Sequence, residues 1–149
     1  MFESNLALHW KFDPTLNVAY PEDELATAAD QDKFRINAKA GKTHEGYSTV
    51  SFLPNLNGTG NVLIITGTGG TAVAAALDFL SNERAMADLG ARVGAKKGSE
   101  FPPFETLLKI EKGADLPRNT SIVTCRTLPS ARKYSTPVAQ NTTQGYGKN

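Results

Sequence analysis

The sequence has little of the residues that would point directly to a function. Cys125 is the single cysteine among 149 residues, so a disulfide within the chain is impossible and a cytoplasmic protein is expected. Lys and Arg number 16 and Asp and Glu 15, a balance that argues against bulk attraction to nucleic acid. The most apolar windows, 61–65 and 72–80, are much shorter than the about 20 residues of a membrane-spanning helix. Neither nucleic acid nor a membrane is therefore an expected partner.

Candidate catalytic and metal-binding groups are equally sparse. The two histidines, His9 and His44, are separated by a loop-rich stretch and have no metal-ligand spacing. Cys125 falls within an expected strand, where a small core residue is favoured over a nucleophile because neither histidine is placed to activate it. No Ser–His–Asp or paired-carboxylate pattern stands out. We therefore predict no catalytic residues, no metal and no cofactor.

The composition that remains is that of a globular chain. Hydrophobic residues make up 40% and charged residues 21%, which excludes a fully disordered chain and a coiled coil. From Pro129 onward the sequence is mostly Ser, Thr, Gln, Asn and Gly, with little to bury. We predict a single domain over residues 1–130, followed by a disordered polar tail over residues 131–149.

The first third of the chain has weak patterns. A short helical turn is expected near residues 4–10 and a strand over 16–20. The acidic, alanine-rich stretch 21–32 is expected to be a solvated loop, with a helical turn as an alternative for part of it, and the polar stretch 38–46 a second loop.

Clearer patterns begin at Tyr47 and predict the fold class. Strands are expected at 47–53, 62–65, 104–111 and 121–128, and helices at 71–80 and 82–89. The continuous apolar run Val62–Ile65 is typical of a strand that is buried on both faces. We expect Leu77 of the following helix to be fully buried against that strand. The predicted fold is α/β with α+β character: a mixed sheet, a main helix after a glycine turn, and a C-terminal antiparallel hairpin.

One motif has a chemical mechanism. The residues Gly67, Thr68, Gly69, Gly70 and Thr71 lie between an apolar strand and a helix, where backbone N–H groups and hydroxyls can hold a phosphate or another anion. No Lys follows the glycines, and no second parallel strand with a terminal acidic residue follows the helix. The alternative, which we favour, is a tight strand-to-helix turn whose glycines relieve steric crowding.

A basic loop is the second candidate for anion binding. Arg92, Lys96 and Lys97 lie among three glycines between residues 90 and 98. Three charges in such a loop are more often a solvated surface than a site.

The central block also resembles a domain of uncharacterised soil-bacterial proteins. The resemblance rests on the run from Gly46 to Thr68, most specifically Leu53–Thr68, on the alanine-rich helix ending at Leu80, and on Phe104–Leu108. It implies the C-terminal α/β part of larger regulatory-type proteins, some with a DNA-binding segment upstream, and it carries over no catalytic residues. In the longer members a further strand precedes the position of Ser4, so an N-terminally incomplete domain is expected here.

Two functions follow as expectations. The first is a non-catalytic sensory or interaction module of a bacterial regulatory-type protein, whose partner is an upstream domain or another protein. The second is a small-ligand or nucleotide-binding domain that uses the turn Gly67–Thr71.

Overall fold

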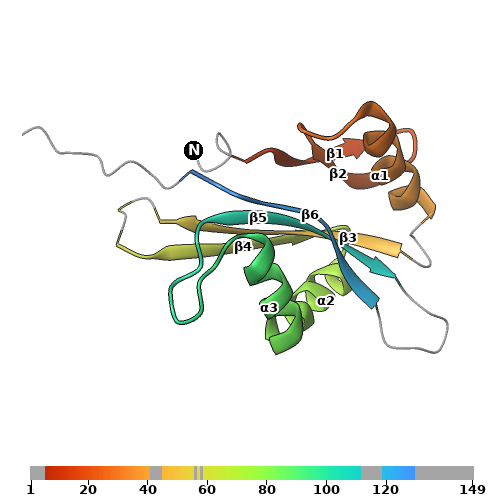
Figure 1. Ribbon diagram of the computed structural model, residues 1–149. Helices are drawn as coiled ribbons and strands as arrows, with labels where there is room; N and C mark the ends of the chain where they lie inside the picture. Colours follow the sequence, from red (N-terminus) through yellow and green to blue (C-terminus); the bar gives the residue numbers. More distant parts are fainter. Residues whose placement is uncertain (1–5, 41–44, 56, 58, 112–118, 130–149) are drawn as a thin grey trace, which may run out of the picture.

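A computed structural model describes residues 6–40, 45–55, 57, 59–111 and 119–129. They form three layers, of which the middle one is a four-stranded sheet (Figure 1). Helices α2 and α3 cover one face of the sheet, and the N-terminal unit, β1, β2 and α1, covers the other. The elements are β1 (Leu8–Asp13), β2 (Val18–Asp23), α1 (Ala28–Ala40), β3 (Glu45–Pro54), β4 (Asn61–Gly67), α2 (Gly70–Ser81), α3 (Glu83–Arg92), β5 (Phe104–Glu111) and β6 (Asn119–Thr127).

The sheet has the strand order β4-β3-β5-β6, and β1 pairs with β2 in a separate ribbon. All pairings among the described strands are antiparallel, whereas the sequence predicted a mixed sheet. The α+β character, the helix after the glycine turn and the C-terminal hairpin β5–β6 are confirmed. Because β3 and β5 are central, their residues are the most deeply buried, and β4 and β6 form the two edges.

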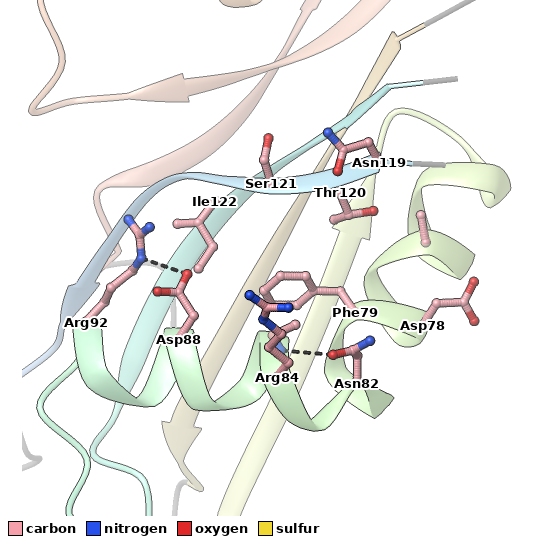
Figure 2. Close-up of a pocket in the computed structure, with 12 residues that line it drawn as sticks. Asp78, Phe79, Asn82, Arg84, Asp88, Arg92, Asn119, Thr120, Ser121 and Ile122 are labelled. Atoms are coloured by element: carbon pink, nitrogen blue, oxygen red, sulfur yellow. Dashed lines mark hydrogen bonds and ion pairs between the residues drawn. The ribbon is translucent and has the colours of Figure 1, made fainter. Parts of the chain in front are cut away.

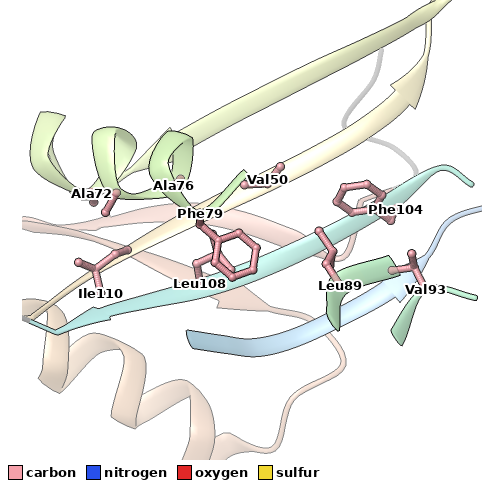
Figure 3. Close-up of a cluster of buried hydrophobic side chains, with 10 residues drawn as sticks. Val50, Ala72, Ala76, Phe79, Leu89, Val93, Phe104, Leu108 and Ile110 are labelled. Carbon is pink, nitrogen blue, oxygen red and sulfur yellow. The ribbon is translucent and has the colours of Figure 1, made fainter. Parts of the chain in front are cut away.

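The helix layer forms the larger core. The alanine-rich face of α2 lets its backbone approach the sheet closely, and Asn82 accepts a hydrogen bond from the Ala85 N–H (3.0 Å) to begin α3. The core residues, most of them labelled in Figure 3, are Val50, Ala72, Ala75, Ala76, Phe79, Leu89, Val93, Phe104, Leu108 and Ile110.

A smaller core lies under the N-terminal unit. Leu8 and Phe34 pack against Tyr47 and Leu107 of the sheet, and the rings of Phe34 and Tyr47 meet edge-on with centroids 5.7 Å apart. These sheet residues alternate along their strands with those that face α2 and α3, because successive side chains of a strand point to opposite faces. The sheet is therefore buried on both sides.

Buried charges fasten this unit to the sheet. Glu105 of β5 is fully buried, and its carboxylate accepts hydrogen bonds from the N–H groups of Ala7 (3.1 Å) and Leu8 (3.3 Å). Nε of Arg126 lies 3.5 Å from Oε1 of the same carboxylate. Nη2 of Arg126 donates a hydrogen bond to Oδ2 of Asp23, in β2, at 2.5 Å. One arginine thus joins two buried acids from different layers.

The N-terminal expectations were partly wrong. Residues 8–10 of the expected helical turn belong to strand β1, whereas the expected strand over 16–20 overlaps β2. The expected acidic loop contains the end of β2 and the start of α1, and the described ends of the second expected loop belong to α1 and β3. The Thr27 hydroxyl accepts from the Asp30 N–H (3.3 Å) and donates to the Asp30 carboxylate (2.7 Å), which caps α1. These segments have weak patterns of their own and gain their structure by docking on the sheet.

Two burial expectations were also wrong. Among the described strands β4 pairs with β3 alone and forms an edge, so Leu63 is 49% exposed instead of buried on both faces. Leu77 is 51% exposed because α2 turns Ala72, Ala76 and Phe79 toward the sheet, and Leu77 lies on the flank of the helix. The expected polar tail, residues 131–149, lies outside the described residues. No helix in the described part of the chain has both the length and the apolar character to cross a bilayer.

The buried arginine gives a stability prediction. Arg126→Met should lower the free energy of unfolding by about 3–5 kcal/mol, because it leaves Glu105 and Asp23 buried without a counter-charge. Chemical denaturation measures this value. Arg92→Met is the matched control, since its ion pair with Asp88 is exposed, and it should cost less than about 1 kcal/mol. Equal effects of the two substitutions would contradict a fastening role for Arg126.

Candidate functional site

The predicted glycine turn connects β4 to α2, and several of its polar groups bond within the protein. The Thr68 N–H donates to the Tyr47 carbonyl (3.0 Å), and the Thr68 hydroxyl accepts from the Tyr47 N–H (3.2 Å). The N–H groups of Ala72 and Val73 donate to the Gly69 carbonyl at 2.9 and 3.2 Å. Thr68 therefore fastens the turn to β3.

The glycines of the turn differ in their surroundings. A Cβ at Gly67 would lie 3.1 Å from Ala72 Cβ and 3.2 Å from the Val73 backbone nitrogen, so this glycine permits the close approach of α2 to β4. A Cβ at Gly69 or Gly70 would meet nothing within 4 Å, and neither residue adopts the left-handed conformation. Relief of crowding thus accounts for Gly67 alone.

The basic loop is spread over an exposed surface. Arg92 ends α3, and its Nε donates to Asp88 of the same helix at 3.0 Å. Lys96 and Lys97 are exposed in the loop that follows. The Lys96 carbonyl accepts from Ser99, which makes a local turn and leaves the lysine side chains in solvent.

Cys125 is half-buried on the helix-facing side of β6, where it packs against the larger core. Burial raises the pKa of the Cys125 thiol, and nearby Arg92 lowers it by less. His9 is engaged in the N-terminal unit, with Nε2 3.1 Å from Glu24, and His44 lies outside the described residues. No group of three or more His, Cys, Asp and Glu side chains in the described part of the chain could hold a metal ion.

A groove that sequence reasoning missed lies between β6 and the helices α2 and α3 (Figure 2). It is open to solvent and has a volume of about 1070 Å³. Phe79 and Ile122 lie toward its interior, and Thr120 points toward Phe79 whereas Ser121 points away. The lining residues are Ala75, Asp78, Phe79, Asn82, Arg84, Ala85, Asp88, Arg92, Asn119, Thr120, Ser121 and Ile122.

The strand beside the groove is the last in the sheet. β6 pairs with β5 on one side, and no described strand pairs with its other side. Regular pairing runs from Asn119 to Ile122, and a bulge at Val123 then interrupts it. The regular part of this open edge is therefore the part that borders the groove.

The rim of the groove carries both signs of charge. Asp88 and Arg92 neutralise each other, and the Asn82 side chain is used to cap α3. Arg84 and Asp78 are exposed and make no ion pair among the described residues. The groove thus combines an apolar interior, an open strand edge and a polar rim.

The sequence contained part of the signal for this groove. Alternation in β6 places Thr120 and Ile122 on the same face of that strand. The helical pattern of α2 places Ala75 and Phe79 on the same face of that helix. That these faces meet at an edge follows from the strand order, which alternation does not encode. Comparison of the chain with protein-family models, curated proteins and solved structures finds no match.

The glycine turn yields a stability prediction. Gly67→Ala should lower the free energy of unfolding by about 1–3 kcal/mol, because the added methyl presses on the α2 backbone. Gly70→Ala should leave stability unchanged or raise it by up to about 1 kcal/mol, since the methyl has open space and alanine favours a helix. Thermal and urea unfolding of both variants measures the difference. A larger loss for Gly70→Ala would contradict the steric account.

Proposed function

We propose that this protein is a non-catalytic interaction module that binds an extended segment of a partner polypeptide along β6. The observation that carries the proposal is the open strand edge Asn119–Ile122 beside the groove. An edge strand presents unpaired backbone N–H and C=O groups, and a polypeptide in extended form is the ligand that pairs with them.

Main-chain pairing does not distinguish one peptide sequence from another, and the groove would supply this selectivity. Successive side chains of a bound strand point to opposite faces, so every second side chain of the partner would enter the groove. There it would contact Phe79 and Ile122, while Arg84 and Asp78 at the rim would meet polar side chains. Main-chain hydrogen bonds would provide affinity and the apolar interior the preference for particular residues.

The nature of the partner is proposed from the sequence alone, which resembles C-terminal domains of soil-bacterial regulatory-type proteins. In such a protein the partner segment would belong to an upstream domain or to another protein, and the module would act in the cytoplasm. This role requires no catalytic group.

Selection from a random peptide display library tests the proposal. Enriched peptides should bind the parent protein, and their addition should shift the backbone NMR signals of residues 119–122 and of α2 and α3. Thr120→Arg should weaken binding about tenfold or more, because the larger side chain points into the groove. Leu77→Arg is the control, since Leu77 is half-exposed on α2 and does not line the groove, and it should leave affinity nearly unchanged.

Two results would contradict the proposal. One is a selection that enriches no peptide above background, and the other is binding that Thr120→Arg does not weaken. Phosphate, ATP and NAD serve as comparison ligands in thermal-shift measurements. A shift with these ligands would favour the alternative function, a small-ligand or nucleotide site at Gly67–Thr71.

A further inference from the structure

Asn57 and Gly58, in the connection between β3 and β4, form the only Asn-Gly pair in the chain. Glycine has no Cβ, so its backbone nitrogen can approach the side-chain amide of a preceding asparagine more closely than that of any other residue. Asn57 is exposed to water, and Gly58 lies outside the described residues. The pair therefore combines the sequence that favours reaction of an asparagine side chain with an exposed position of that asparagine.

The other asparagine of this connection is held by hydrogen bonds. Oδ1 of Asn55 accepts from the N–H groups of Thr59 (3.0 Å) and Gly60 (3.3 Å), and its Nδ2 donates to Oγ1 of Thr59 (3.4 Å). The Asn55 N–H also donates to the Gly60 carbonyl at 2.9 Å, which closes the loop at its base. No hydrogen bond joins the Asn57 side chain to another described residue. The two asparagines thus differ in how firmly their amides are held.

We propose that Asn57 is a site of spontaneous deamidation, which converts its neutral amide into a carboxylate. The backbone nitrogen of Gly58 bonds to Cγ of Asn57, and the bond from Cγ to Nδ2 breaks. Nδ2 leaves as ammonia and takes the proton of the Gly58 amide. Water then adds to one of the two carbonyl groups of the resulting succinimide ring and breaks its bond to nitrogen. The products are aspartate and isoaspartate at position 57, and water is the only co-reactant.

The new carboxylate changes the charge of the chain. Lys and Arg number 16 and Asp and Glu 15, so one further acid lowers the formal net charge from +1 to zero. The charge also enters a stretch that has none, since no charged residue occurs between Glu45 and Asp78. A net charge near zero removes the repulsion that keeps copies of a protein apart. The deamidated chain should therefore have a lower isoelectric point than the parent, whose value is about 7.8.

The fold should survive this change. The hydrogen bonds that close the loop belong to Asn55, Thr59 and Gly60, and residue 57 takes part in none of them. The inference concerns the connection between β3 and β4 and does not rest on the proposed function.

Peptide mass mapping of the full chain during incubation at mildly alkaline pH tests the proposal, with and without urea. Position 57 should gain the mass of a deamidation in both samples. Its rate in the folded chain should lie within about tenfold of the rate in urea, because an exposed side chain without hydrogen bonds needs little opening to react. Asn55 is the internal control, since its amide is held, and it should stay intact in the folded chain.

Two variants test the chemistry of the pair. Gly58→Ala should slow the conversion about tenfold or more, because the added Cβ hinders ring closure. Asn57→Gln, whose longer side chain would have to close a larger ring, should also slow it. Circular dichroism establishes that each variant is folded, and either one suffices if the other fails to fold.

Three results would overturn the inference. The first is a folded chain that stays intact at position 57 while the chain in urea converts. The second is conversion of Asn55 before Asn57 in the folded chain. The third is a folded Gly58→Ala or Asn57→Gln variant that loses ammonia from residue 57 at the rate of the parent.

Discussion

The contact between Arg126 and the two buried acids Glu105 and Asp23 is the interaction on which the three-layer arrangement depends. Burying charges costs free energy unless each charge has a partner with good geometry. Here the Glu105 carboxylate has the guanidinium and two backbone N–H groups, and Asp23 has the same guanidinium. Since Asp23 lies in β2 and the two N–H groups belong to Ala7 and Leu8, these contacts to Arg126 and Glu105 form only when the N-terminal unit is docked.

Docking of the N-terminal unit leaves the strand edges as the open features of the sheet. Both faces are covered, one by α2 and α3 and the other by β1, β2 and α1. The edges differ in character: β6 has a bulge at Val123 and borders a groove, whereas β4 is regular and uncharged. The groove beside β6 is the feature on which the proposed binding of an extended polypeptide segment rests.

The sequence predicted the local elements after Tyr47 well and those before it poorly. Strong alternation in β5 and β6 and the alanine-rich run of α2 were sufficient to place those elements. The segments now forming β1 and α1 have weak patterns, and contacts with Tyr47, Leu107 and Glu105 decide their structure. For the candidate site, the glycine turn was located correctly in the chain, but the bonds of Thr68 to Tyr47 could not be seen without the β3–β4 register.

The sequence by itself determined the strand and helix propensities of the central block, the close approach made possible by Gly67, and the absence of charge from Gly46 to Leu77. Only the tertiary structure decided that β4 and β6 are edges, because an apolar run such as Val62–Ile65 is compatible with both a central and an edge strand. The tertiary structure also decided that Phe79 and Ile122 line the same groove and that Arg126 forms ion pairs with both Glu105 and Asp23. Strand order and register bring together residues about 100 positions apart, and a local pattern extends over only a few turns or strand residues.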